Sequence, residues 1–214
     1  MGVPNQYVFI PCAYTRAGKT TLSDLWSRFR ANKRISIDAR RLDAFGPDYV
    51  FDATLDITGI LEPAAADLTV SIRNKFNVFV DDVNLDLATR KLWIDAVRKA
   101  EPSNRMCKIY CIRIPTPISV CFERCTLNLR GLTAQYWCEV LDRMEVQLMG
   151  DPEFPVEHPN QEPMLEEGFD GIVSPSEALV LLTSNSCHPT ASVDHIDFSV
   201  EIADWAELEN EWKK

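Results

Sequence analysis

The sequence predicts an α/β domain built on a mostly parallel, doubly wound sheet. The chain has 214 residues, of which 46% are hydrophobic and 25% are charged, as is typical of one globular domain. Short apolar runs alternate with stretches of helical periodicity along the chain. Several of these runs lack the polar alternation of half-exposed strands, which favours strands that are buried on both faces.

The first half of the chain predicts a strand, a loop and a helix, and then a second strand. A strand is expected at 7–11, and a helix follows within 20–30 because its large apolar residues recur at helical spacing. A second strand is expected at 35–38, before a charged, turn-rich stretch. Helical candidates then continue through 66–76.

The second half continues the alternation. The expected strands are 77–82, 106–114, 169–173 and 195–202, and the expected helices are 88–100, 118–129 and 133–148. The strand at 195–202 is predicted from alternation of Ile196, Phe198, Val200 and Ile202. We expect one principal domain at 1–182 and an acidic C-terminal extension at 183–214.

Charge is distributed unevenly along the chain. The net charge is −10, and residues 151–214 hold 15 of the 32 acidic side chains but only two of the 22 basic ones. The first 150 residues therefore carry 20 basic and 17 acidic side chains, or +3. The net charge of −10 argues against indiscriminate binding of phosphate backbones, and the uneven distribution indicates a near-neutral body with an acidic C-terminal portion. Autoinhibition by the acidic extension, through imitation of a phosphate strand, is a hypothesis.

No export signal or membrane span is recognisable, so a cytoplasmic or nuclear location with reduced cysteines is expected. Four of the seven cysteines form two Cys-x3-Cys pairs: Cys107, Cys111, Cys121 and Cys125. Four thiolates could bind zinc. Core packing is the favoured interpretation, because these pairs have strand and helix spacing within apolar runs.

A phosphate-binding loop is the most specific motif. Residues 13–20 read AYTRAGKT, which matches Gly-x4-Gly-Lys-Ser/Thr except that Ala13 replaces the first glycine. Such a loop wraps backbone N–H groups around phosphate, while its lysine and hydroxyl serve the γ-phosphate and Mg²⁺. The motif predicts ATP and Mg²⁺ as cofactors. The nucleotide-binding candidates are Ala13, Ala17, Gly18, Lys19, Thr20 and Thr21. The alternative is a plain helix N-cap at Thr20 or Thr21.

An acidic and a basic residue follow the second predicted strand. Asp38 could accept the proton of an attacking hydroxyl, and Arg41, with Arg40, could bind a phosphate of the acceptor. The alternatives are a helix N-cap for Asp38 and a solvated charge for Arg41. Basic residues gather in this region and could follow a nucleic-acid strand or merely form a soluble helix face: Arg28, Arg30, Lys33, Arg34, Arg40 and Arg41.

From about residue 7 to 175, this order of motifs resembles the polynucleotide 5′-kinases of phage and of animal DNA repair. The resemblance implies a P-loop kinase fold with a helical lid, Asp38 as general base and Arg41 on the acceptor phosphate. VFVDDVNLD resembles the family's strand-end segment, which implies Asp81 or Asp82, with Thr20, near magnesium; Val83 replaces a threonine. CFERCTLNLRG resembles the lid, which implies Arg124 and Arg130 on the ATP phosphates; Cys125 replaces an asparagine.

The resemblance implies an ATP-dependent kinase that phosphorylates the 5′-hydroxyl of single-stranded or end-exposed RNA or DNA. Lys19, Asp38 and Arg124 are the catalytic candidates. No phosphatase or ligase motif is recognisable, so such a partner activity would lie on a separate chain. The sequence decides neither between RNA and DNA nor whether the chain is a homo-oligomer. The alternatives are a kinase of a small metabolite or nucleoside, including a zeta-toxin-like kinase, and a degenerate nucleotide-binding protein.

Overall fold

A five-stranded parallel sheet forms the centre of the computed structural model, which describes residues 6–28, 31–46, 49, 58–102, 106–129, 131–184 and 199–212. The strand order is β2-β3-β1-β4-β5, and every pairing is parallel. The strands are β1 (Gln6–Cys12), β2 (Asn32–Ser36), β3 (Asn77–Asp81), β4 (Cys107–Arg113) and β5 (Gly171–Val173). This is the predicted α/β class with an all-parallel sheet.

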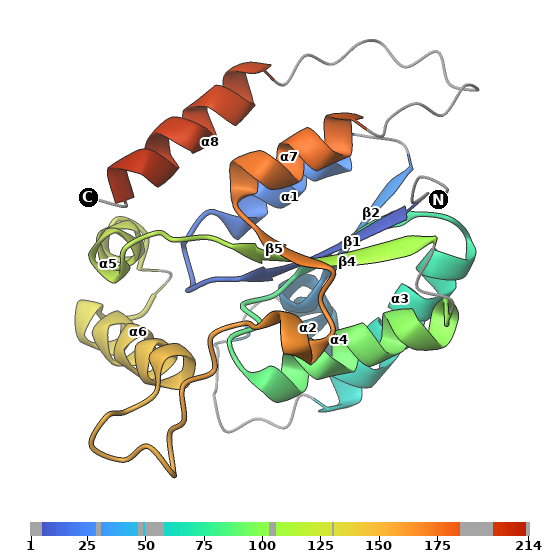
Figure 1. Cartoon of the computed structure of the whole chain (residues 1–214). Helices are drawn as coiled ribbons and strands as arrows, with labels where there is room; N and C mark the ends of the chain where they lie inside the picture. Colours follow the sequence, from blue (N-terminus) through green and yellow to red (C-terminus); the bar gives the residue numbers. More distant parts are fainter. Residues whose placement is uncertain are drawn as a thin grey trace.

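Helices cover both faces of the sheet, as in a doubly wound fold (Figure 1). Helices α1 and α7 lie on one face and α3 and α4 on the other, while α5 and α6 lie beyond the carboxyl end of β1. The helices are α1 (Lys19–Ser27), α2 (Ile37–Phe45), α3 (Thr58–Arg73), α4 (Leu87–Ala100), α5 (Ile118–Thr126), α6 (Ala134–Met149), α7 (Pro175–Ser184) and α8 (Ser199–Trp212). A 3₁₀ turn, η1, covers Leu165–Glu167.

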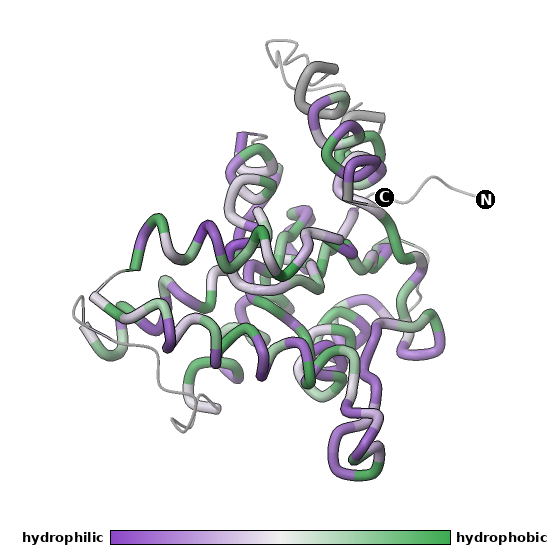
Figure 2. Tube along the Cα trace, turned by 90° about the vertical axis from the view of Figure 1, so that its left-hand side faces the viewer, coloured by the Kyte–Doolittle hydropathy of each residue, from purple (hydrophilic) through white to green (hydrophobic). Residues whose placement is uncertain are grey.

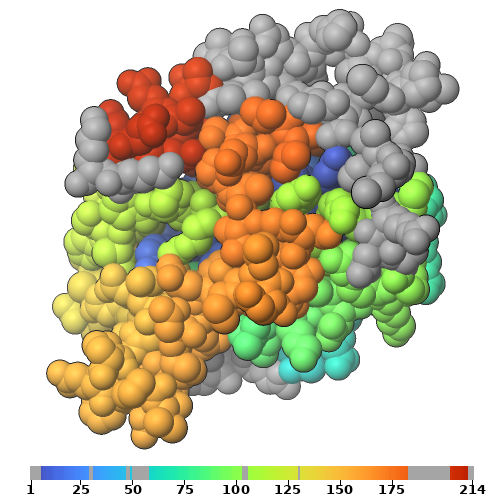
Figure 3. Space-filling model, viewed as in Figure 1, coloured from blue at the N-terminus to red at the C-terminus, as the bar shows by residue number. Residues whose placement is uncertain are grey.

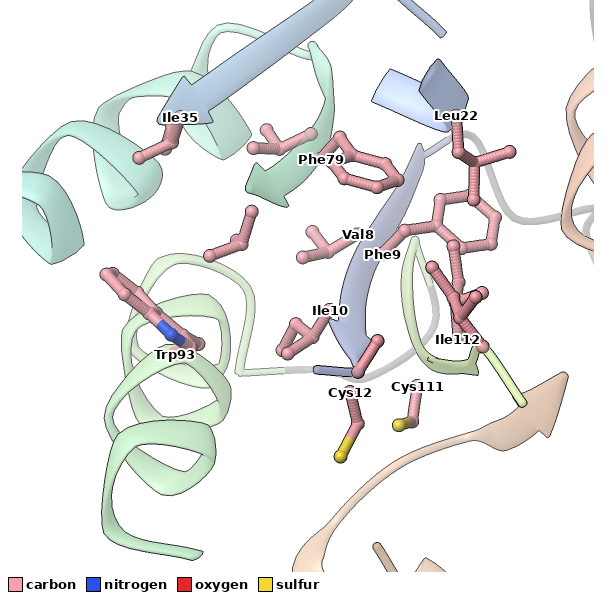
Figure 4. Packing of buried hydrophobic residues seen from close by; sticks show 14 of the residues in the cluster. Val8, Phe9, Ile10, Cys12, Leu22, Ile35, Phe79, Trp93, Cys111 and Ile112 are labelled. Carbon is pink, nitrogen blue, oxygen red and sulfur yellow. The ribbon is translucent and has the colours of Figure 1, made fainter. Parts of the chain in front are cut away.

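The central strand β1 is buried along its whole length. Successive side chains alternate between the two layers: Val8 and Ile10 point toward the α4 side, whereas Phe9 points toward α1 and packs edge-on against Trp26 at 4.7 Å between ring centroids (Figure 4). The predicted burial of β1 on both faces is therefore confirmed. Along the helices that cover the sheet, hydrophilic residues are interspersed with hydrophobic ones (Figure 2).

Helices α2 and α7 were not predicted, and the strand predicted at 195–202 is wrong over its described part. Ser36 caps α2 by accepting a hydrogen bond from the Ala39 N–H, so Asp38 lies in the first turn of a helix rather than in a strand. Helix α8 begins at Ser199, and its buried Trp205 and Glu209 are four residues apart, which is helical rather than strand spacing. Residues 195–198 lie outside the described part.

The cysteine pairs belong to the core, as the favoured interpretation expected. Cys107, Cys111, Cys121 and Cys125 are fully buried. Burial raises the pKa of the Cys107 thiol to about 12 and that of Cys121 to about 11, which favours the neutral thiol over a metal-binding thiolate. Across the described residues, no cluster of three or more metal-binding side chains occurs.

Candidate active site at the carboxyl edge of the sheet

The predicted phosphate-binding loop joins β1 to α1, which is the position between strand and helix that its sequence predicts. Gly18 has φ 105° and ψ 7°, a left-handed conformation that suits glycine, and α1 begins at the next residue, Lys19. Arg16 is also left-handed, with φ 61°. The first N–H groups of α1 have no partner within the helix, so this end of α1 favours a phosphate.

Alanine in place of the first motif glycine costs no backbone strain here. Ala13 is fully buried and does not have a positive φ, unlike Arg16 in the same loop. Its N–H donates to the Val83 carbonyl oxygen at 3.1 Å, which ties the loop to the end of β3. Glycine is therefore not needed for its conformational freedom at position 13.

Lys19 is folded back onto the loop. Its Nζ donates to the carbonyl oxygens of Tyr14 at 2.6 Å and Ala13 at 3.3 Å. Burial lowers the pKa of Lys19, while Asp81, Asp82 and Asp38 act in the opposite direction. The lysine thus lies within the electrostatic reach of the acidic residues at this edge, and a phosphate group in the loop would stabilise its charge further.

Two further side chains hold the loop from the β4 side. Thr116, just after β4, donates from its hydroxyl to the Ala17 carbonyl oxygen at 2.8 Å, and Arg124 of α5 donates to the Arg16 carbonyl oxygen at 2.9 Å. Arg124 was predicted as a lid residue and does reach the loop. Thr116 was missed, although its place after a parallel strand was a usable signal. Arg130 lies outside the described residues.

Asp38 and Arg41 form a pair at the start of α2. Arg41 Nη1 lies 2.8 Å from Asp38 Oδ1. The side chain of Arg41 is 9% exposed, whereas that of Asp38 is 82% exposed. A buried guanidinium group thus contacts one oxygen of an exposed carboxylate. Arg40 lies elsewhere, because its Nη2 pairs with Asp67 Oδ2 of α3 at 2.8 Å.

The two strand-end aspartates have different surroundings. Asp81 forms an ion pair with Arg34 on the neighbouring strand. Asp82 is buried; burial raises its pKa to about 6, and Arg41 opposes this rise. Asn84 supports the turn, since its Nδ2 donates to the carbonyl oxygens of Pro11 at 2.8 Å and Asp82 at 3.0 Å.

This donor set fits a magnesium ion that is held mainly by substrate and water. Mg²⁺ commonly takes only one or two protein ligands and keeps several waters together with phosphate oxygens. The Thr20 hydroxyl, at the exposed first turn of α1, and the Asp82 carboxylate would supply the protein ligands. Asp81 would bind only after release from Arg34.

Replacement of Asp82 by asparagine should stabilise the metal-free protein at neutral pH. With a folded pKa of about 6 against about 4 when unfolded, ionisation of Asp82 destabilises the fold as pH rises from 4 to 7. Relative to wild type, the free energy of unfolding of the Asp82→Asn variant should rise by roughly 2–3 kcal/mol from pH 4 to pH 7. Urea unfolding with chelator at pH 4 and 7 measures this gain, and a pH-independent difference would contradict the burial effect.

Acidic side chains pair with most of the predicted basic cluster. Lys33 and Arg40 both pair with Asp67, at 2.6 and 2.8 Å, and Arg34 pairs with Asp81 and Asp24. Arg30 lies outside the described residues. A nucleic-acid strand following these side chains would therefore have to compete with intramolecular ion pairs.

The acidic C-terminal helix reaches the phosphate loop. Helix α8 packs on α7 (Figure 3), and the Glu209 carboxylate accepts hydrogen bonds from the N–H and hydroxyl of Ser176 at 2.9 and 3.0 Å. The Trp205 ring packs on Gly18: a Cβ at that glycine would lie 2.9 Å from Cη2 of the ring. This contact joins segments that are far apart along the chain and was not predicted.

No protein-family model matches the sequence, and no curated protein is similar to it. Among solved structures, a fungal RNA kinase is similar over 99% of both chains, with TM-score 0.50 and 13% identity. A sugar kinase from Janibacter sp. matches over 85% of this chain and 94% of its own, with TM-score 0.50 and 14% identity. The fold is that of a P-loop kinase.

A chain of the Pnkp1/Rnl/Hen1 RNA repair complex is similar over 76% of this chain, with TM-score 0.51 and 16% identity. The match covers 49% of that chain, so this P-loop kinase fold spans about half its length. The resemblance to polynucleotide kinases that the order of motifs suggested is thus matched by a similarity in fold. In the described part of the chain, no helix has the length and apolar character needed to cross a membrane.

Proposed function

We propose that this chain is an ATP-dependent kinase that transfers the γ-phosphate to the 5′-hydroxyl end of RNA or DNA. The observation that carries the proposal is the Asp38–Arg41 pair, which lies at the same edge of the sheet as the Lys19 loop. A kinase needs a proton acceptor for the hydroxyl and a cation for the donor phosphate. The pair supplies the acceptor side, and the loop supplies the donor side.

In the proposed reaction, Asp38 removes the proton from the 5′-hydroxyl as its oxygen attacks the γ-phosphorus of ATP. The bond from that phosphorus to the β–γ bridging oxygen breaks, and ADP leaves. Lys19 and Arg124 stabilise the negative charge during transfer. Thr20 and Asp82 would hold Mg²⁺, which would supply further neutralisation of charge on the phosphates. Arg41 binds the phosphate that follows the first nucleoside and also orients Asp38.

A second candidate function is phosphorylation of a small metabolite or nucleoside. The observation that favours it is electrostatic: the chain carries a net charge of −10, and acids pair with Lys33, Arg34 and Arg40. A small acceptor needs few phosphate contacts, so Arg41 would be enough. A degenerate nucleotide-binding protein is less favoured. The replacement of the first motif glycine by Ala13 does not strain the loop, so it is no evidence that nucleotide binding has been lost.

The deciding experiment measures transfer of label from γ-labelled ATP with Mg²⁺. The acceptors are 5′-hydroxyl RNA and DNA oligonucleotides, nucleosides and sugars, and the Lys19→Ala protein is the control. We expect label on the oligonucleotide ends, absent with Lys19→Ala. Label on small acceptors only would establish the metabolite kinase, and ATP binding without any transfer would establish a degenerate relative. A ligase or phosphatase partner would be sought on a separate chain.

The autoinhibition hypothesis now has a specific contact to test. Glu209 is bound to Ser176 of α7, and Trp205 packs on Gly18 of the phosphate loop. The Trp205 ring on Gly18 therefore gives α8 a route to inhibition that does not need a carboxylate in the loop.

A further inference from the structure

One face of α2 carries apolar side chains in line with the proposed base. Positions four and seven residues after Asp38 lie on the same face of a helix, and they are Leu42 and Phe45. The exposed fractions of Leu42 and Phe45 are 46% and 44%. Isolated exposed apolar residues are ordinary, but these two continue the face that presents the open carboxylate of Asp38.

A second ring supports Phe45. Gly46, with φ 88°, ends α2, and the Tyr49 N–H donates to the Gly46 carbonyl oxygen at 3.1 Å. This turn brings the Tyr49 ring against Phe45, with 5.2 Å between centroids and 27° between planes. Such a stacked pair holds the Phe45 ring in place, so little rotamer freedom remains to be lost when another flat group binds.

The spacing fits a short strand of nucleotides. Residues seven apart in a helix are separated by about 10 Å along its axis, at about 1.5 Å per residue. Successive stacked nucleotides advance by about 3.4 Å, so about three such steps cover this distance. An acceptor whose 5′-hydroxyl meets Asp38 therefore reaches Phe45 with its third or fourth nucleotide. A nucleoside or nucleoside 3′-phosphate would not reach that ring.

We propose that Leu42, Phe45 and Tyr49 form a stacking platform for a base of the acceptor strand. The proposal rests on the proposed function and adds how the acceptor is recognised. Lys33, Arg34 and Arg40 already form ion pairs within the protein, so they are less available to the phosphates of an acceptor strand. Stacking on the platform supplies binding in their place. Stacking is tolerant of sequence, because every base has a flat face. The platform therefore selects single-stranded acceptor ends over small metabolites, with little dependence on sequence.

The test compares the KM values of Phe45→Ala and wild type for a 5′-hydroxyl octanucleotide, a nucleoside 3′-phosphate and ATP. Loss of one stacking contact should raise the octanucleotide KM about 5- to 100-fold, with the other two KM values unchanged. Phe45→Trp should restore tight binding. Val70→Ala, at a 50% exposed apolar residue on α3, is the matched control and should resemble wild type.

Binding is also measured without turnover, by fluorescence anisotropy of a 3′-labelled octanucleotide, and melting temperatures check that each variant is folded. If wild type phosphorylates oligonucleotides but Phe45→Ala leaves the octanucleotide KM and anisotropy unchanged, the platform is wrong and the proposed function stands. If wild type labels only small acceptors, the proposed function is itself wrong. An equal rise in KM for the octanucleotide and the nucleoside 3′-phosphate would also overturn the platform, because it would indicate general damage to α2.

Discussion

Asp38→Asn should lower kcat for 5′-hydroxyl acceptors by about 10²-fold or more, with little change in the KM for ATP. Asparagine keeps the size of the side chain and an oxygen that can accept from Arg41, but it cannot take up a proton at neutral pH. Positioned general bases typically contribute about 10²–10⁴-fold. The Asp38 side chain is 82% exposed, so the substitution should not disturb the core.

Steady-state kinetics with varied ATP and varied acceptor measure this effect. Asp43→Asn is the matched control, because Asp43 is an exposed carboxylate on the same helix, and we expect wild-type kinetics from it. A kcat for Asp38→Asn within a few-fold of wild type would assign the base to another residue, and the buried Asp82 would then be examined first.

Arg90→Met should destabilise the fold by about 3–5 kcal/mol, the usual effect of removing one partner of a buried ion pair. Arg90 is fully buried on α4 and grips Glu167 of η1 through two bonds, of 2.7 Å from Nε and 2.8 Å from Nη2. It also donates to the carbonyl oxygens of Leu85 at 2.6 Å and Gln161 at 2.7 Å. The substitution leaves a buried carboxylate and the carbonyl groups of Asn84, Leu85 and Gln161 without this donor.

Denaturant unfolding measures the loss. The double variant Arg90→Met/Glu167→Met should be more stable than Arg90→Met alone, because it removes the unpaired charge. Arg113→Met is the control: its bond to Glu162 is 3.0 Å long, but the two side chains are 29% and 44% exposed, so the change should cost less than about 1 kcal/mol. Equal losses for Arg90→Met and Arg113→Met would contradict the importance of burial.

The sequence was informative where one short segment determines the structure. The apolar run of β1, the glycine and lysine of the loop and the periodicity of α1 are neighbours along the chain, so strand, loop and helix could be predicted together. Helix α2 was missed because its only strong local signal is the Ser36 cap, and most of its side chains are polar or exposed. Alternation over a few residues also suggested a strand where α8 begins.

Contacts between distant segments could not be predicted in the same way. Arg90 and Glu167 are 77 positions apart and look like ordinary surface charges until the fold buries both. The ion pairs of Asp67 with Lys33 and Arg40 likewise depend on how α3 packs beside β2 and α2. The sequence could therefore identify the basic residues of this region but not their neutralisation.

The contact between Trp205 and Gly18 has a consequence for how the protein is made. Trp205 follows the loop glycine by about 190 residues, which at roughly 5–20 residues per second leaves an interval of roughly 10–40 s during synthesis. In that interval the nascent chain can already hold β1, the loop and α1, but not the indole ring that later covers Gly18. The phosphate loop is thus synthesised well before the tryptophan ring that packs on it.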